Sequence, residues 1–501
     1  MSTSSSIESR TSRNSSSSTN CVALVAAEVQ VLAGATRGVR LKGFDDQGEA
    51  FDLGDIVYRK INDEYKSQVA ELHRLYCENN LESKGIVETI MRPDGDLEHR
   101  KLVTSYPYEW PANMYKDAVL FHLRLFEELD KAGLTLKDAL PNNIAFDHTT
   151  PVFVDFLSLA PLERLREMRW LRAEGYADPR FAVVKRMLLR RMILPLLFMA
   201  SRRYRIARDL LSIRSNRCGG KPPSWRELLV PLGRALRYLR CLAVATELLS
   251  VERSGRDKDA AAFRALISKL GRRVRALDVT PPRSGYSSDY DRKNEALLPA
   301  DPAGFLPKQK TVFEILRARA PRSVLDIGAN TGWYSILASR LGASVIALEE
   351  DEFCVDVLYD RAKMQGLHIL PLKVSFGDLT REIRGESTDE NAIYRAGVER
   401  LGADLVLVLG LAHHLVLGEG RSIDDVFEVL RKLAAKTLVL EFVSLDDEKI
   451  RDAPGFFPNL KKYSSSNYNL ERMLESGRRH FATVDIRPSH PATRTILVFD
   501  K

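Results

Sequence analysis

The 501-residue sequence has few cysteines and no long apolar run. Its five cysteines form no Cys-x-x-Cys pair, so the sequence predicts neither a disulfide framework nor a structural zinc site, and it suits a reducing cytosol. The most apolar stretch, 192–200, has nine residues, less than half of the roughly 20 that a membrane-spanning helix needs. No repeat with a period of 20–50 residues is present. These absences exclude a small disulfide scaffold, a membrane span and a solenoid.

The composition is that of a globular protein, with 45% hydrophobic and 28% charged residues. Because one hydrophobic core stops growing at roughly 250–300 residues, we expect two or three domains. The charge is distributed unevenly. Segment 161–277 has 28 Lys and Arg against 10 Asp and Glu, a net charge of +18, so the rest carries −10 of the total of +8. This asymmetry indicates segments with distinct tasks.

Changes in composition and periodicity predict five segments along the chain. The first 20 residues include ten serines and almost no apolar side chain, which is typical of a disordered tail. Mixed α/β periodicity, then helical periodicity with many arginines, then a stretch rich in Pro, Gly and Ser follow before the last domain. The expected segments are a tail (1–35), a mixed α/β accessory domain (36–160), a basic helical region (161–279), a linker (280–301) and a C-terminal domain (302–501). Within the accessory domain, periodicity predicts helices over 64–79 and 115–131 and a strand over 151–159.

The basic helical region has two interpretations. In the first, it is a helical bundle whose solvated face carries arginine. In the second, the positive charge forms a groove for an anionic substrate or partner, since clustered positive charge concentrates anions. Nucleic acid is not favoured as the partner, because no aromatic-interleaved or zinc-based motif accompanies the charge.

The most informative stretch is 322–352, which predicts a strand, a glycine turn, a helix and a second strand. The strand ends at Ile327, and the glycines of the turn allow a ligand to approach the backbone closely. The turn therefore lies at the carboxyl end of a strand, where doubly wound sheets bind ligands. Glu349 ends the second strand, and a carboxylate there can accept two hydrogen bonds from a ribose diol.

Two kinds of nucleotide fit such a turn. A pyrophosphate-binding loop would need glycine at the positions of Asn330 and Trp333, and the extra carboxylate of Asp326 favours a cationic ligand instead. The stretch Asp-Ile-Gly-Ala-Asn-Thr-Gly-Trp-Tyr-Ser resembles motif I of class I S-adenosylmethionine-dependent methyltransferases. The resemblance implies an α/β fold with a doubly wound, seven-stranded Rossmann-like sheet and S-adenosylmethionine as cofactor. It implies cofactor contacts from Asp326, Gly328, Asn330, Gly332 and Glu349, and further along the chain from Ser375 and Asp404. The alternative for Asp326 is that it only orders the loop.

Downstream segments extend this resemblance, and 437–443 and 494–499 resemble later strands of the same fold. Segment 403–415, Ala-Asp-Leu-Val-Leu-Val-Leu-Gly-Leu-Ala-His-His-Leu, resembles motif IV, with Asp404 leading a buried strand. His413 or His414 is the candidate general base, because histidine titrates near neutral pH, and Glu441 is placed behind them. The alternative is that one histidine packs and the other caps the strand. Ser375 stands where the family often has an acid against adenine. No metal ligands are predicted.

The front half has a second set of polar residues. Asp138 is followed by Asn143, and Asp155-Phe156 comes 12 residues after that. This spacing resembles the catalytic loop and metal-binding Asp of protein-kinase-like and aminoglycoside-phosphotransferase-like folds, in which Lys60 would contact phosphate. The alternative is a β-hairpin with Asp and Asn in its turn.

A resemblance over 40–501 connects both halves. Ser-Tyr-Pro-Tyr-Glu-Trp at 105–110, the segments around Asp138 and Asp155, and the methyltransferase motifs are similar to a bacterial family of long methyltransferase-like proteins that includes a rhizobial host-specific nodulation protein. This resemblance implies a cytoplasmic methyltransferase whose acceptor is a nodulation-signal glycolipid or another anionic small molecule. The alternatives are a non-catalytic protein that binds anions or a partner and keeps a relic cofactor pocket, and a kinase-like phosphotransferase in the front half.

Overall fold

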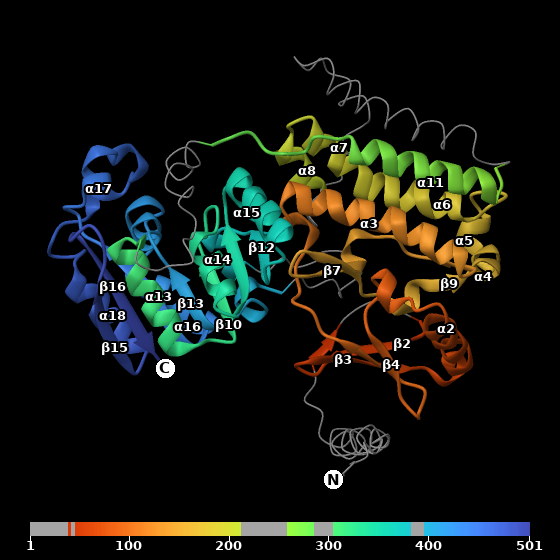
Figure 1. Ribbon diagram of the computed structural model, residues 1–501, viewed down its shortest axis with the longest axis horizontal. Helices are drawn as coiled ribbons and strands as arrows, with labels where there is room; N and C mark the ends of the chain where they lie inside the picture. The colour runs from red at the N-terminus through yellow and green to blue at the C-terminus, as the bar shows by residue number, and fades with distance from the viewer. Residues whose placement is uncertain (1–38, 42–45, 212–257, 285–303, 382–394) are drawn as a thin grey trace, which may run out of the picture. The chain divides into compact units, whose positions relative to one another are not determined.

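The computed structural model describes residues 39–41, 46–211, 258–284, 304–381 and 395–501 (Figure 1). Contacts divide the chain into two compact units. One is the described part of Met1–Lys66 with Ile90–Lys101, and the other is Ser67–Thr89 with Leu102–Lys501. The predicted tail (1–35) and most of the predicted linker (280–301) lie outside the described residues. The domain boundaries expected at 160, 279 and 302 stay predictions.

The first unit is built on a five-stranded sheet with the order β1-β2-β3-β5-β4. Asp96 joins the end of β3 to the start of β5, because it accepts hydrogen bonds from the Tyr58 hydroxyl and, at 2.8 Å, from the Ile61 amide. Lys60 lies exposed on β3. The strands are β1 (Val39–Leu41), β2 (Gly48–Asp52), β3 (Ile56–Ile61), β4 (Thr89–Met91) and β5 (Leu97–Arg100).

Two helices begin the second unit, and both were expected from their periodicity. Helix α2 (Lys66–Glu78) buries Val69, Leu72 and Tyr76, which recur at helical spacing. Helix α3 (Ala112–Lys131) begins three residues earlier than predicted and ends before Gly133, whose φ of +67° stops the helix.

Short strands follow α3 and frame the Asp138–Asp155 loop. Strand β6 (Leu134–Leu136) pairs with β9 (Leu159–Pro161), and β7 (Ile144–Asp147) forms a hairpin with β8 (Thr150–Phe153). The single strand expected over 151–159 is therefore two strands. They are separated by a turn in which the Ser158 amide donates to the Asp155 carbonyl at 3.0 Å and the Ser158 hydroxyl donates to the Asp155 carboxylate.

The described part of the basic region is mainly helical, with turns and coil between its helices, and 212–257 lie outside the described residues. Apolar side chains of α7 are buried, while many arginines elsewhere in the region are exposed. Arg180 differs, because it is buried against Asp178, Asp130 and the ring of Phe263. The helices are α4 (Leu162–Glu167), α5 (Arg169–Arg172), α6 (Arg180–Val183), a π-helix (Val184–Ile193), α7 (Leu194–Ala200), α8 (Tyr204–Leu211) and α11 (Ala260–Arg275).

The back half is built on a seven-stranded sheet with the order β12-β11-β10-β13-β14-β16-β15. Strands β10 to β14 are parallel, and β16 is antiparallel to both of its neighbours. The parallel strands are nearly continuous apolar runs because both faces of the sheet are covered. The strands are β10 (Ser323–Ile327), β11 (Ser344–Glu349), β12 (Ile369–Lys373), β13 (Ala403–Val408), β14 (Ala434–Val443), β15 (Thr483–Pro488) and β16 (Arg494–Asp500).

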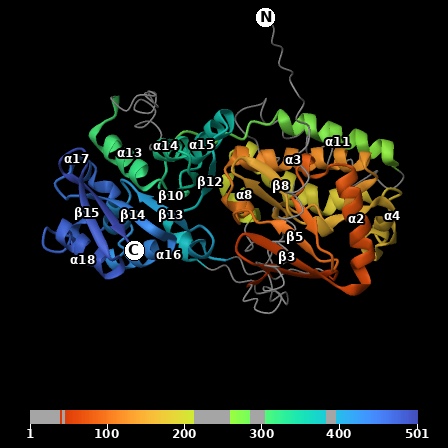
Figure 2. The ribbon, with the colours of Figure 1, turned by 60° about the horizontal axis from the view of Figure 1, so that its bottom comes forward.

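Helices cover this sheet on two sides. Figure 2 shows α13, α14 and α15 along one side of the strands and α16 and α18 along the other. Leu337 of α14 and Leu358 of α15 pack with Val324, Val345 and Leu405 of the strands in one buried cluster. The helices are α13 (Pro307–Arg319), α14 (Trp333–Arg340), α15 (Glu352–Gln365), α16 (Ile423–Leu433), α17 (Glu448–Asp452) and α18 (Leu470–His480).

Helix α15 is also held by helices from the front of the same unit. Asn113 of α3 donates from its amide nitrogen and from Nδ2 to the carboxylate of Asp356, at 2.7 and 2.9 Å. Arg208 of α8 forms an ion pair with Glu352 at 2.7 Å. Burial raises the pKa of Asp356 to about 8. One face of α15 therefore packs on the sheet, and polar contacts fix another part of the helix to the front helices.

Candidate cofactor site at the carboxyl edge of the sheet

The glycine turn after β10 has an unusual backbone. Gly328, Asn330 and Gly332 all have positive φ, and the amides of Gly328 and Ala329 both donate to the Leu348 carbonyl at 2.9 Å. A Cβ on Gly332 would stand 2.1 Å from Leu358 Cδ1, so this glycine lets α14 pack against α15. A Cβ on Gly328 would stand 3.3 Å from the Leu411 side chain. The glycines predicted to serve a ligand thus also serve the packing of the protein itself.

Glu349 lies at the end of β11 and is tied to this turn. Its carboxylate accepts hydrogen bonds from the Asn330 amide at 2.7 Å and from the Asp351 amide at 2.8 Å. Burial raises the pKa of Glu349, and the two amides oppose the rise. The structure therefore brings together the predicted ribose-binding acid and the predicted turn. Each carboxylate oxygen has two lone pairs and so can accept a further hydrogen bond.

Asp326 is the last residue but one of β10 and is buried. The Ser335 hydroxyl of α14 donates to its Oδ2 at 2.6 Å. Burial raises the pKa of Asp326 to about 6, and Ser335 and the charge of Lys308 oppose this rise. The position at the start of the turn is as predicted, while the hydrogen bond to Ser335 agrees with the alternative that Asp326 orders the loop.

His413 and His414 follow β13, with their rings 4.2 Å apart and Phe457 within 5.6 Å of both. His413 is only 5% exposed, and its Nδ1 has no hydrogen-bond partner in the part of the chain that the structure describes. Burial lowers the pKa of both histidines, and for His413 the charges of His414 and Arg494 add to this effect. Both imidazoles are therefore held in the neutral form, which can accept a proton.

Glu441 has other partners than the two histidines. It is fully buried on β14, where it forms an ion pair with Lys308 Nζ at 2.6 Å and accepts the Ser489 hydroxyl at 2.7 Å. No hydrogen bond joins it to either histidine among the described residues. The expectation that Glu441 lies behind the histidines stays a prediction. Lys308 and Ser489 were missed by the sequence reasoning, because they come from segments 133 and 48 residues away from Glu441.

Ser375 follows β12 and lies at the same edge of the sheet, next to the Glu349 strand. Its hydroxyl donates to Asp378 Oδ2 at 2.7 Å and accepts the Asp378 amide at 3.3 Å. Asp378, the acid that comes three residues after Ser375, is thus hydrogen-bonded to it. A contact of this pair with adenine stays a prediction.

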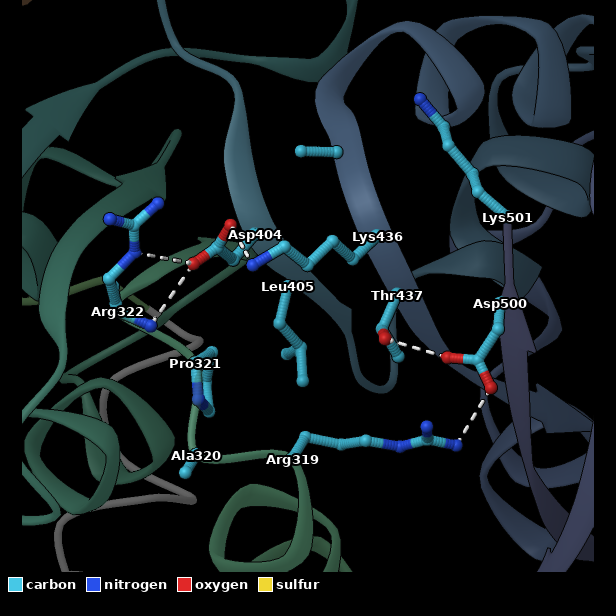
Figure 3. Close-up of a pocket in the computed structure, with 11 residues that line it drawn as sticks. Arg319, Ala320, Pro321, Arg322, Asp404, Leu405, Lys436, Thr437, Asp500 and Lys501 are labelled. Atoms are coloured by element: carbon cyan, nitrogen blue, oxygen red, sulfur yellow. Dashed lines mark hydrogen bonds and ion pairs between the residues drawn. The ribbon is translucent and has the colours of Figure 1, made fainter.

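The predicted cofactor contact of Asp404 is wrong. Asp404 starts β13 at the opposite edge of the sheet, where it pairs with Lys436 at 3.0 Å and accepts the Arg322 amide at 3.1 Å (Figure 3). The hydrogen bond from Lys436 lowers its pKa. A pocket of about 590 Å³ opens there, lined by Arg319, Arg322, Asp404, Lys436, Asp500 and Lys501 among others. An acid that leads a parallel strand must lie at the amino end, away from the glycine turn.

Register places the other predicted residues at one edge. Strands β10 to β14 run in the same direction, so their carboxyl ends lie at the same edge of the sheet. Near that edge Ile327 lies beside Leu348, and Val408 lies beside Leu440. The carboxyl ends of β10, β11, β12, β13 and β14 therefore carry Asp326, Gly328, Asn330, Gly332, Glu349, Ser375, His413, His414 and Glu441. This edge is the place where doubly wound sheets bind ligands.

The front half carries a second polar cluster in the second unit. Asn143 Nδ2 donates to the Asp138 carbonyl at 3.3 Å, and the Asn143 carbonyl accepts the Val154 amide at 2.9 Å, next to Asp155. Burial, followed by the charge of Asp155, raises the pKa of Asp138 to about 6. Asp138 and Asn143, which precede the β7–β8 hairpin, thus lie near Asp155, which follows it.

Two kinds of feature are absent from the described residues. In those parts of the chain, no helix combines the length and the apolar character that crossing a membrane requires. The same residues contain no group of three or more His, Cys, Asp or Glu side chains arranged to hold a metal ion.

Known proteins resemble parts of this chain. No family model matches the sequence. The chain is similar to a nodulation protein. That relative, nodulation protein NoeA of Rhizobium meliloti (strain 1021), is 26% identical over 452 residues, which cover 85% of this chain and 89% of NoeA. The resemblance to the long bacterial family that includes a rhizobial nodulation protein is therefore confirmed, and it spans both halves of the chain.

Solved structures match smaller parts of the chain than NoeA does. Monomeric WbdD matches with a TM-score of 0.27 and 16% identity over 44% of this chain and 42% of WbdD. The match thus spans less than half of WbdD, which another structure describes as a bifunctional kinase-methyltransferase. Magnesium protoporphyrin IX methyltransferase from Synechocystis PCC 6803, solved with bound S-adenosylhomocysteine, matches with a TM-score of 0.28 and 16% identity over 43% of this chain and 95% of that enzyme.

Proposed function

We propose that the back half is a class I S-adenosylmethionine-dependent methyltransferase. The observation that carries this proposal is the hydrogen bond between Glu349 at the end of β11 and the turn backbone at Asn330. It holds the ribose-binding acid beside the glycine turn, in a sequence that resembles motif I. The strand order, with the only antiparallel partner strand next to β14, agrees with the doubly wound fold that the resemblance implies.

The residues at this edge suit a positively charged nucleotide. Asp326, Glu349 and Glu441 contribute three carboxyl groups, and Lys308 neutralises one of them. The cofactor, when bound, supplies a methyl group on a positively charged sulfur. A buried carboxylate attracts a neighbouring positive charge more strongly than the same carboxylate in bulk water does, because the local dielectric constant is low. Glu349 would hold the ribose, and the turn from Gly328 to Gly332 together with Asp326 would hold the methionine and sulfonium end.

The histidine pair would remove the proton from the acceptor. The lowered pKa of His413 keeps its imidazole neutral, so that the unpartnered Nδ1 can take a proton from a hydroxyl or amine. Phe457 lies against both rings and shields them from water. Alignment of the acceptor can supply much of the acceleration, since approximation alone provides roughly 7–11 kcal/mol. The acceptor that we infer is a small molecule or a glycolipid, such as a nodulation signal.

Titration of the full-length protein with S-adenosylhomocysteine in a calorimeter tests this proposal. We expect Glu349→Gln to weaken binding roughly 10- to 100-fold, because hydrogen bonds to a charged group contribute about 1.5–3 kcal/mol. Glu350→Gln is the matched control, since Glu350 is the exposed neighbour of Glu349 and should bind as the wild type does. Absence of binding by the wild-type protein would contradict the proposal and favour the alternative of a non-catalytic protein that binds anions.

A phosphotransferase site in the front half is the second candidate function. It is favoured by the proximity of Asp138, Asn143 and Asp155 at the base of the β7–β8 hairpin, and by the raised pKa of Asp138. In such a site the three residues would act as base and magnesium ligands. The structure describes Lys60 in the other unit, so the candidate rests on the loop alone.

A further inference from the structure

Lys308 is a cation at the carboxyl edge that no motif in the sequence marks. It is the second residue of α13, and its side chain is 18% exposed. Its Nζ lies 2.6 Å from Glu441 Oε2 and 5.5 Å from the centroid of the Tyr334 ring. The side chain thus reaches from α13, which precedes the first strand of the sheet, to β14.

The Lys308 ammonium group retains the capacity to donate. It has three N–H groups, and Glu441 is the only hydrogen-bond acceptor it has among the described residues. Beside the Lys308 ammonium group there is space for a ligand atom, because the nearest residue on that side is a glycine. Gly410 has no side chain, and a Cβ there would stand 3.7 Å from Glu441 Oε2 and 4.0 Å from Lys308 Nζ. An anionic oxygen can therefore approach Lys308 next to Gly410.

The charge of Lys308 acts on two of the predicted site residues. It lowers the pKa of Asp326 at the end of β10 and that of His413 after β13. Other charged groups face these residues as well, namely Glu349 near Asp326, and His414, Arg494 and Asp447 near His413. Lys308 thus lies between the start of the glycine turn and the candidate base, where the amino-acid end of the cofactor would be seated.

We infer that Lys308 binds the α-carboxylate of the amino-acid part of the cofactor. This inference rests on the proposed function and adds a specificity-determining residue to it. The cofactor carries one carboxylate, and that group needs a cation beside it in a site otherwise lined by acids. The ion pair with Glu441 leaves the local charge near zero, so Lys308 can donate to an anion without repelling the neighbouring sulfonium.

The affinities of the wild-type protein and of Lys308→Met for two ligands test this inference. The ligands are S-adenosylhomocysteine and its decarboxylated analogue S-adenosyl-3-thiopropylamine, and calorimetry measures their affinities. We expect wild-type protein to bind S-adenosylhomocysteine roughly 10- to 100-fold more tightly than the analogue, the range of one charge-assisted hydrogen bond. In Lys308→Met this preference should disappear, because only the first ligand loses a contact. Lys310→Met, an exposed lysine on the same helix, should keep the wild-type preference.

Three results would overturn the inference. Equal affinity of wild-type protein for both ligands would do so without any variant, even if Lys308→Met failed to fold. Preservation of the preference in Lys308→Met, or in Lys308→Gln if the first variant misfolds, would show that another group holds the carboxylate. In both cases S-adenosylhomocysteine still binds, so the proposed function would stand. Failure of wild-type protein to bind either ligand would overturn the proposed function together with the inference.

Discussion

At the scale of the residue, burial decides which acids of the site are charged. Asp326 has its pKa raised to about 6 because it is buried, and its hydrogen bond with Ser335 limits the rise. In the unfolded chain the value is 3.8, so the folded protein retains this proton at a higher pH. Ionisation of Asp326 therefore costs stability as the pH rises from about 4 to about 6.

Asp326→Asn should remove this pH dependence. The variant keeps an oxygen for the Ser335 hydroxyl but carries no charge. We expect its free energy of unfolding, relative to that of the wild type, to increase by about 3 kcal/mol between pH 4 and pH 7, since one pKa unit corresponds to 1.36 kcal/mol. Guanidinium unfolding followed by circular dichroism at four pH values measures the difference. A difference that stays constant over this range would show that Asp326 does not titrate there.

At the scale of the element, local sequence predicted the strands of the back half well. The runs 323–327, 344–348 and 437–443 are β-branched or aliphatic, and each lies within a strand of the sheet. Strand β15 was not predicted because most of its side chains are exposed, so it lacks the apolar signal of a buried strand. The position of Asp404 was predicted wrongly. The motif identified strand β13 correctly, but Asp404 lies near the amino end of this strand, whereas the glycine turn lies at the carboxyl edge of the sheet. Lys308 leaves no local signal, since its partner is 133 residues away.

The junction of α14 and α15 predicts a contrast between two glycines. Gly332→Ala places a Cβ 2.1 Å from Leu358 Cδ1 in a left-handed backbone, whereas Gly342→Ala meets no atom within 4 Å in a similar backbone. We expect Gly332→Ala to lose about 2–5 kcal/mol of stability, from backbone strain and overpacking together, and Gly342→Ala about 1–2 kcal/mol from strain alone. Urea unfolding compares the two. Equal losses would mean that the Leu358 side chain moves aside freely.

At the scale of the whole molecule, the similarity to NoeA covers both halves, so the front half is shared with this relative as the back half is. The sequence spacing predicted the loop of Asp138, Asn143 and Asp155, because residues close in sequence determine it. It could not predict how α3 and α8 meet α15, since residues such as Asn113 and Asp356 are 243 positions apart.

The front-half loop predicts a separable activity. With Mg²⁺ and ATP, we expect the full-length protein to release phosphate, and Asp155→Ala to reduce that rate at least 100-fold, because the carboxylate would hold the metal. The affinity of the same variant for S-adenosylhomocysteine should not change, which provides the control. Phosphate release that is insensitive to Asp155→Ala would exclude this loop as its source.

Helix α15 begins three residues after Glu349 and receives Asn113 and Arg208 from the front helices along its length. Its 14 residues form a stiff rod of about 21 Å. A displacement of the front helices would therefore be transmitted along this rod to the acid that is proposed to hold the ribose. Because these contacts are made at the first and fifth residues of α15, a shift of the front helices would change the position of Glu349 and with it the affinity for the nucleoside.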